Sequence, residues 1–158
     1  MRPSRDQWAM EMVKVTAKRA TCLRRQVGCV LLNERGHVLA TGYNGVASGM
    51  QHCNEALNVD SLGRPMSGCD YPHACAGAKS QSGTNLDGCE AIHAEQNALL
   101  QCRNVYEIHA CYVSCSPCIT CTKLLLNTSC QEIFFEEEYP MPCAKDLWLK
   151  AGRRWVKL

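Results

Sequence analysis

The residues best suited to chemistry lie within residues 89–121. His93 and Glu95 are separated by one residue, and Cys118 and Cys121 are separated by two. One imidazole and two thiolates supply three protein ligands for Zn²⁺ and leave the fourth position open for water. Glu95 is not needed as a ligand, and a carboxylate beside a metal-bound water is suited to carry protons. The pattern therefore indicates a catalytic zinc site. A structural zinc site, the alternative, would use a fourth protein ligand and would have no role for Glu95.

Two helices and one strand must position these residues. Residues 94–100 are rich in good helix formers, and Pro117 is expected at the first position of a second helix, where proline is favoured. Cys118 and Cys121 would then share one face of that helix. The segment 109–114 (HACYVS), between the two helices, is typical of a buried strand. The order helix, strand, helix should place both sets of ligands on one edge of a sheet, so we expect both helices to begin at one metal ion. The N-terminal ends of the helices would favour thiolate over thiol.

The remaining segments predict an α/β fold with three layers, α/β/α, around a central mixed five-stranded sheet. The further expected elements are a helix over residues 7–24, hairpin strands over 27–32 and 38–43, a strand over 132–137, a helix over 144–150 and a last strand over 153–157. Residues 46–90 interrupt this order as an insert that carries cysteines and is rich in Gly, Ser, Asn, Asp and Pro. An irregular segment of this length is uncommon in a compact domain unless it is functional or disordered.

Length and composition exclude several classes of protein. With 158 residues we expect one domain, residues 1–158, and a net charge of +2 gives no case for binding nucleic acid. The chain has no apolar run near the roughly 20 residues that span a bilayer, and residues 1–10 contain no hydrophobic signal region, so neither membrane nor export is expected. Thirteen cysteines in such a chain favour metal sites and free thiols over disulfides. The expected location is the cytoplasm, or the host cytoplasm if the protein is viral.

Several motifs together carry a resemblance to a known family. They are TCLRRQVGCVLL, GYNG, HCNE, IHAEQNALL, YVSCSPCITC and EEEY, and they extend over nearly the whole chain. The chain resembles the cytidine deaminase superfamily, in which H-x-E and P-C-x-x-C mark the zinc-dependent nucleobase deaminases, and within it the deoxycytidylate deaminases. The resemblance implies a cytidine-deaminase-like fold and hydrolytic deamination of dCMP to dUMP and ammonia, which supplies dUMP for thymidylate synthesis. It also implies that His93, Cys118 and Cys121 hold a zinc ion whose hydroxide attacks C4 while Glu95 shuttles protons.

The same resemblance suggests residues that bind the substrate. Asn44 is expected to hydrogen-bond the deoxyribose, and the backbone at Ala94 and near Ser116 to read the edge of the base. Because arginine suits phosphate, the loop before the first strand is expected to bind the 5′-phosphate, unless its arginines are solvated surface charges. This loop consists of Arg24, Arg25 and Gln26. Tyr112 and Tyr139 are candidates for the pocket wall, with ordinary core packing as the alternative.

Two further sites are expected on the same grounds. Several deoxycytidylate deaminases hold a structural zinc that pins the insert, and buried free thiols are the alternative reading of the cysteines. The candidate ligands for this second zinc are Cys22, Cys53, Cys75 and Cys89, with His52 or His73 as substitutes. The resemblance also implies a homohexamer, which is common in the family. It implies activation by dCTP, with Mg²⁺ bound to that nucleotide, and inhibition by dTTP. The effector site would involve the insert together with Gly42, Tyr43, Asn44 and Gly45. Their two glycines indicate either a backbone that approaches something closely or a plain tight turn.

Two alternative functions stay open at the level of sequence. A deaminase of the same superfamily that acts on tRNA or single-stranded nucleic acid would need a basic groove and stacking aromatic residues. The net charge of +2 and the aromatic content of 6% count against that alternative. A zinc-binding module without catalytic activity would have no use for Glu95, so this residue separates the second alternative from an enzyme.

Overall fold

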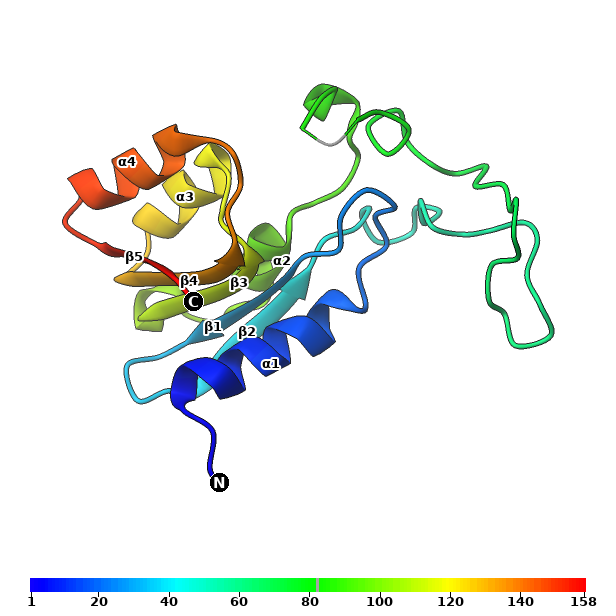
Figure 1. Ribbon diagram of the computed structural model, residues 1–158. Coiled ribbons are helices and arrows are strands. Elements are labelled where there is room, and N and C mark those ends of the chain that lie inside the picture. Colours follow the sequence, from blue (N-terminus) through cyan, green and yellow to red (C-terminus); the bar gives the residue numbers. More distant parts are fainter. Residues whose placement is uncertain (82) are drawn as a thin grey trace.

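A mixed sheet of five strands forms the centre of the computed structural model, which describes residues 1–81 and 83–158 (Figure 1). The strands are β1 (Gly28–Leu32), β2 (Val38–Tyr43), β3 (Ala110–Cys115), β4 (Glu132–Glu137) and β5 (Arg154–Lys157). Their order across the sheet is β2-β1-β3-β4-β5. β1 is antiparallel to both β2 and β3, whereas β3, β4 and β5 run parallel. This arrangement confirms the mixed five-stranded sheet and the first hairpin.

Helices cover both faces of the sheet and complete three layers. The helices are α1 (Arg5–Ala17), α2 (Ala94–Gln101), α3 (Ile119–Leu126) and α4 (Pro142–Lys150), with short 3₁₀ turns at η1 (Leu86–Gly88) and η2 (Val105–Glu107). α1 packs on one face against side chains of β1, β3 and β4, and α2, α3 and α4 pack on the other. All five residues of β1 are buried, as expected for a strand that is covered on both faces. The predicted α/β/α architecture is therefore confirmed.

The end of α1 and the start of α3 differ from the sequence prediction in ways that affect the residues near the metal ligands. α1 ends at Ala17 and not at residue 24, because the backbone N–H of Thr21 donates to the carbonyl of Asn44 (3.1 Å) and so joins the end of β2 instead of a helical turn. The freed residues 18–27 form a loop. α3 begins at Ile119 with Cys118 as its N-cap, so Pro117 precedes the helix and does not occupy its first position.

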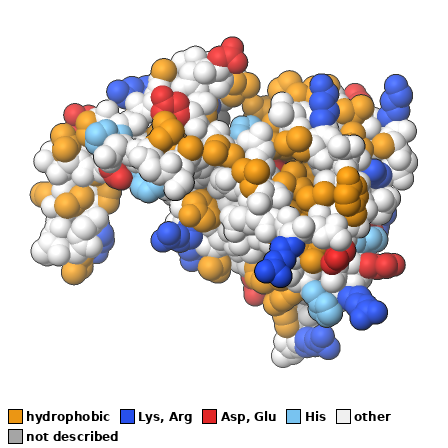
Figure 2. Space-filling model, turned by 180° about the vertical axis from the view of Figure 1, so that it is seen from behind, with side chains coloured by type: hydrophobic (Ala, Val, Ile, Leu, Met, Phe, Trp, Pro, Cys, Tyr) orange, Lys and Arg blue, Asp and Glu red, His pale blue; other side chains and the backbone are white. Residues whose placement is uncertain are grey.

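The insert, residues 46–90, leaves the body after β2 and returns before α2 (Figure 1). Residues 54–73 form an arm that local hydrogen bonds hold together, such as Leu57 N to Asp70 O and Met66 N to Asn58 O, both 3.0 Å. Figure 2 shows this arm standing clear of the body. Residues 75–81 and 83–89 lie nearer the body and include η1. Over the described residues, the structure contains no helix that is both long and apolar enough to cross a membrane.

Candidate metal centre and pocket

Three side chains converge where α2 and α3 begin. Nδ1 of His93 lies 3.5 Å from Sγ of Cys118 and 3.4 Å from Sγ of Cys121, and the three ligand atoms all lie within 4.8 Å of one another. A tetrahedral zinc site with ordinary Zn–N and Zn–S bond lengths separates nitrogen and sulfur by about 3.5 Å. Both the donor set and its spacing therefore fit Zn²⁺.

The helix ends explain why these ligands meet. His93 is the N-cap of α2, and its backbone N–H donates to Oε1 of Gln96 (2.8 Å), which fixes the start of the helix. Cys118 is the N-cap of α3, and its sulfur accepts from the backbone N–H of Cys121 (3.5 Å). Both helices thus direct their N-terminal ends, with unpaired N–H groups, toward the same point.

The two thiols differ strongly in acidity. A hydrogen bond from the Cys121 thiol, with further help from His93, lowers the pKa of Cys118 to about 4. The hydrogen bond that the Cys121 thiol donates to Cys118, together with burial, raises the pKa of Cys121. The pair is therefore poised to hold one negative charge on its own, and a bound dication would favour the second thiolate.

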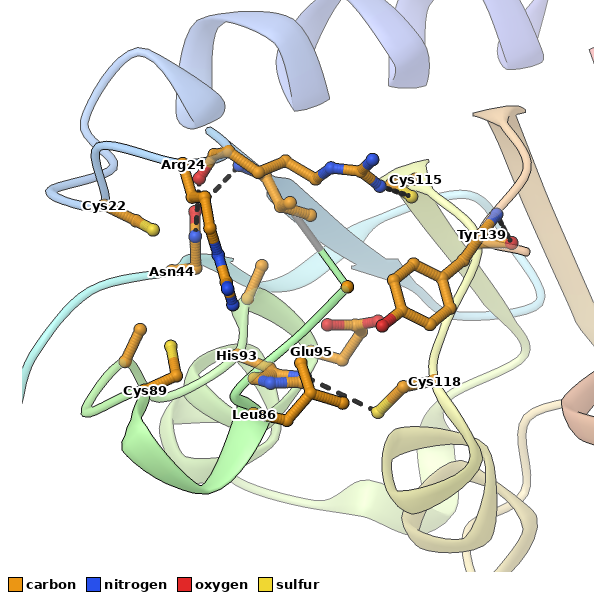
Figure 3. A pocket seen from close by; sticks show the side chains of 16 residues that line it. Cys22, Arg24, Asn44, Leu86, Cys89, His93, Glu95, Cys115, Cys118 and Tyr139 are labelled. Atoms are coloured by element: carbon orange, nitrogen blue, oxygen red, sulfur yellow. Dashed lines mark hydrogen bonds between the residues drawn. The ribbon is translucent and has the colours of Figure 1, made fainter. Parts of the chain in front are cut away.

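Glu95 lies beside the ligands and is only 4% exposed. Burial raises its pKa to about 7, and this effect outweighs the lowering by the nearby His93. Figure 3 shows its carboxylate pointing into the pocket, on the same side as the Tyr139 ring and above His93. A buried carboxyl group whose pKa lies near neutrality can both accept and donate a proton.

A pocket opens over these residues and joins parts of the chain that are distant in sequence. It is lined by Cys22, Arg24, Arg25, Val27, Asn44, Gly83, Leu86, Cys89, Ala91, His93, Ala94, Glu95, Cys115, Ser116, Cys118 and Tyr139. The structure thus brings together nearly all of the residues expected at a catalytic and substrate site. Ser116 is buried, and its hydroxyl accepts from the backbone N–H of Tyr139 (2.7 Å), which holds the loop after β4 at the pocket.

The loop of residues 24–27 forms one rim of this pocket. Both ends of the Asn44 amide hold it: Oδ1 accepts from the Val27 N–H and Nδ2 donates to the Arg25 carbonyl, each at 2.8 Å. Arg25 lines the pocket, with Nη1 2.8 Å from Sγ of Cys115 and its guanidinium 5.8 Å from the centre of the Tyr139 ring. Arg24 reaches instead to the carbonyls of Thr84 and Gln81 in the insert.

Residues 3–137 match the family described as the cytidine and deoxycytidylate deaminase zinc-binding region. The chain belongs to the cytidine and deoxycytidylate deaminase family. It is 38% identical over 143 residues to the deoxycytidylate deaminase of Schizosaccharomyces pombe. The aligned region covers 89% of this chain and 39% of the fission yeast protein. It is 32% identical over 138 residues to the deoxycytidylate deaminase of Mycobacterium phage D29. This aligned region covers 87% of this chain and 98% of the phage protein. The chain therefore spans about two fifths of the fission yeast relative and nearly all of the phage relative.

A solved structure supports the fold of this deaminase-family chain. The dCMP deaminase of the cyanophage S-TIM5, crystallised in complex with dCMP and dUMP, superposes with a TM-score of 0.70 at 21% identity. The match covers 100% of this chain and 99% of the phage chain. At this identity, the likeness shows a shared fold.

Two predicted substrate residues do not lie in the deaminase-family pocket. Tyr112 is fully buried on the opposite face of the sheet, where its ring stacks on Phe134 (4.6 Å between centroids) and its hydroxyl donates to Asp6 (2.6 Å). The proposal that Tyr112 walls the pocket is therefore wrong, because alternate residues of a strand face opposite sides. Gln26 is exposed and is not among the pocket-lining residues.

Sequence reasoning also missed residues that do line the pocket. Cys115 was not among the predicted site residues, yet its sulfur contacts Arg25 at the pocket wall. Its position two residues after Val113, on the face toward the zinc-bearing helices, was the signal that could have identified it. Gly83 and Leu86 of the insert have no comparable signal in the sequence, because nothing local indicates where an irregular segment folds back.

Residues 42–45 comprise the end of β2 and the two residues after it, and their glycines have a clear structural role. A Cβ atom at Gly42 would lie 2.2 Å from the carbonyl oxygen of Ala94, so glycine allows α2 to lie directly on β2. A Cβ at Gly45 would lie 2.3 Å from Oγ1 of Thr21. Of the two explanations for these glycines, the structure favours close approach. Effector binding by residues 42–45 stays a prediction.

The four cysteines expected to hold a second zinc are only partly gathered. Burial, followed by the neighbouring thiols of Cys75 and Cys22, raises the pKa of Cys53, so these three lie near one another. Cys89 lies at the pocket wall. Among the described residues, only His93, Cys118 and Cys121 form a group whose ligand atoms all lie within 4.8 Å, so the second set is more open than the first.

Proposed function

We propose that this chain catalyses the hydrolytic deamination of dCMP to dUMP and ammonia. The observation that carries the proposal is the convergence of His93, Cys118 and Cys121 with the buried carboxylate of Glu95 in one pocket. A structural zinc site has no need for such a carboxylate. The names of the fungal and phage relatives support dCMP as the substrate.

The proposed reaction needs two proton transfers, and Glu95 is placed to make both. When bound by His93, Cys118 and Cys121, zinc supplies the Lewis acidity that makes water nucleophilic near neutral pH. Glu95 accepts a proton from the attacking water and delivers it to N3 as the C4–O bond forms. It then moves the remaining hydroxyl proton to the exocyclic amino group, the C4–N bond breaks, and ammonia leaves. The N3 proton stays on the uracil product, so atoms and charges balance.

Residues on the pocket rim are proposed to bind the rest of the nucleotide. Arg25 lines the pocket and offers a guanidinium group to the 5′-phosphate. Asn44 keeps one amide hydrogen and one lone pair beyond its two backbone bonds, which suits the deoxyribose hydroxyl. The backbone at Ala94 and the segment at Ser116 flank the position of the base.

A substrate panel tests the function directly. Ammonia release is measured with cytosine, deoxycytidine, dCMP, dCTP and CMP on zinc-loaded protein. We expect the highest kcat/KM for dCMP. Turnover of deoxycytidine equal to that of dCMP would remove the phosphate from the proposal, and no release from any of the five would refute a free-nucleotide deaminase.

A deaminase for polynucleotides is less well supported. On the face shown in Figure 2, Lys and Arg side chains are scattered among acidic and uncharged ones and do not form a continuous basic groove. The net charge of +2 agrees with this distribution. Nucleic-acid binding depends strongly on clustered positive charge, so a mononucleotide is the better substrate for this pocket.

A second, structural zinc is proposed at the base of the insert, with ligands drawn from Cys22, Cys53, Cys75 and Cys89. The proximity of the first three supports it, and all thirteen cysteines are free thiols, as in a protein of a reducing cytoplasm. Metal analysis should then give close to two zincs per chain. One zinc per chain, with Cys53 and Cys89 open to alkylation, would refute the second site.

The assembly and regulation proposed for this chain are those of the wider family. We propose a homohexamer that dCTP with Mg²⁺ activates and dTTP inhibits, with residues 42–45 near the effector. Sedimentation gives the oligomeric state, and the dCMP assay repeated with each nucleotide measures the regulation. A monomer that responds to neither nucleotide would contradict this proposal without affecting the chemistry.

A further inference from the structure

Part of the insert forms a wall of the catalytic pocket. Residues 75–81 and 83–89, here called the roof segment, contribute Gly83, Leu86 and Cys89 to the pocket lining. Leu86 remains 52% exposed, so the roof segment has a free outer side. In Figure 3, Leu86 and Cys89 lie across the pocket from the rim that carries Arg24. A substrate in the pocket would therefore lie between the rim and the roof segment.

Local hydrogen bonds give the roof segment its shape. The N–H of Gly77 donates to the carbonyl of Gly88 (2.7 Å), and the hydroxyl of Thr84 donates to the carbonyl of Gln81 (2.6 Å). Gly77 also packs closely on Cys89, because a Cβ atom at Gly77 would lie 2.6 Å from the Cα atom of Cys89. These contacts are internal, so they do not fix where the segment lies relative to the zinc ligands.

Arg24 supplies a hydrogen-bonded connection between the middle of the roof segment, away from Cys75 and Cys89 at its ends, and the body. Its Nη1 donates to the carbonyls of Thr84 (2.7 Å) and Gln81 (3.3 Å). Across residues 1–81 and 83–158, it is the only side chain from outside the insert that hydrogen-bonds to the roof segment. Its neighbour Arg25 points the other way, to Cys115 and Tyr139.

We propose that Arg24 is a positioning residue that holds the roof segment over the pocket, so that the nucleoside part of the substrate is enclosed. Because Nη1 of Arg24 is held by two backbone carbonyls of the insert, we assign the roof segment to Arg24 and the phosphate to Arg25. The inference rests on the proposed function for its kinetic part only. The placement of the roof segment can be measured without any substrate.

The two roles of an arginine at this rim predict different kinetics. Losing the roof contact weakens binding of every ligand that has the nucleoside, so Arg24→Ala should raise KM about tenfold for both dCMP and deoxycytidine, with a smaller change in kcat. An arginine that binds phosphate would raise KM for dCMP alone. The ratio of the two KM changes therefore separates positioning from phosphate binding.

Limited proteolysis provides the readout that is independent of activity. The insert contains one arginine and one lysine, Arg64 and Lys79, and Arg64 precedes Pro65, a bond that trypsin does not cut. Cleavage after Lys79 therefore reports on opening of the roof segment alone. We expect cleavage of the zinc-loaded Arg24→Ala protein to be at least tenfold faster than that of the wild type. Arg2→Ala, which replaces an exposed arginine outside the catalytic pocket, is the control and should match the wild type in both assays.

Each outcome decides a separate claim. Faster cleavage after Lys79 with equal KM changes for both substrates supports the proposal. Unchanged cleavage after Lys79 would overturn the proposal. A KM change confined to dCMP would also overturn it and would indicate that Arg24 binds the phosphate. If the wild type deaminates neither substrate, the proposed function fails, while the cleavage rates still decide whether Arg24 holds the roof segment.

Discussion

Replacing Glu95 by Gln removes the proposed proton carrier with almost no change in shape. The side chain is 4% exposed, so bulk water has little access to take over the transfer. One positioned acid–base group contributes about 10²–10⁴-fold to a rate, and Glu95 serves both proton transfers. We therefore expect Glu95→Gln to lower kcat by about 10³–10⁴-fold, which corresponds to about 4–5.5 kcal/mol in the activation free energy.

The assay combines turnover with metal content. dCMP turnover is followed by ammonia release, and zinc per chain is measured on the same sample, where the variant should retain the metal because Glu95 is not a ligand. Glu90→Gln is the matched control, since Glu90 is exposed, lies outside the pocket lining and precedes the same helix. A kcat within tenfold of the wild type at full zinc content would show that Glu95 does not carry the protons.

Three further perturbations test the pocket and its support. Arg25→Ala should raise KM for dCMP by at least tenfold while that for deoxycytidine changes little, because a charged hydrogen bond to phosphate contributes about 1.5–3 kcal/mol; equal changes would make Arg25 a surface charge. Removing zinc with a chelator should abolish turnover and lower the thermal midpoint, and added Zn²⁺ should restore both; activity that survives complete removal would refute the metal site. Gly42→Ala should destabilise the fold by about 3 kcal/mol or more in urea unfolding, because the new Cβ would lie 2.2 Å from the Ala94 carbonyl. Gly63→Ala, with open space around it, should cost about 1 kcal/mol and serves as its control.

Each half of the metal centre could be predicted because the geometry within that half is local. His93 and Cys118 each cap a helix, and the spacing to Glu95 and Cys121 is set within the first turn of that helix. Such short-range relations do not depend on the rest of the fold. The bounds of β2 and β4 were predicted on similar grounds, since each is a short run of residues that favour strands, bounded by turn signals.

The pocket rim could not be predicted in the same way. Arg24 and Arg25 are neighbours of the same type, yet one contacts the insert and the other contacts β3. Residue type gives the same expectation for both, and only the partners that folding brings within reach distinguish them. The early end of α1 has the same origin, because the Asn44 carbonyl, far along the chain, captures the N–H that a longer helix would have used.

By itself, the sequence determined which atoms can bind zinc and which carboxylate lies beside them, because these relations are fixed within single helical turns. The tertiary structure alone decided that Tyr139 faces the pocket while Tyr112 faces α1, and that the insert closes one side of the site. Those outcomes depend on which face of the sheet each helix covers and on where an irregular segment finds its hydrogen-bond partners. Contacts between residues distant in sequence set both, and no local pattern records them.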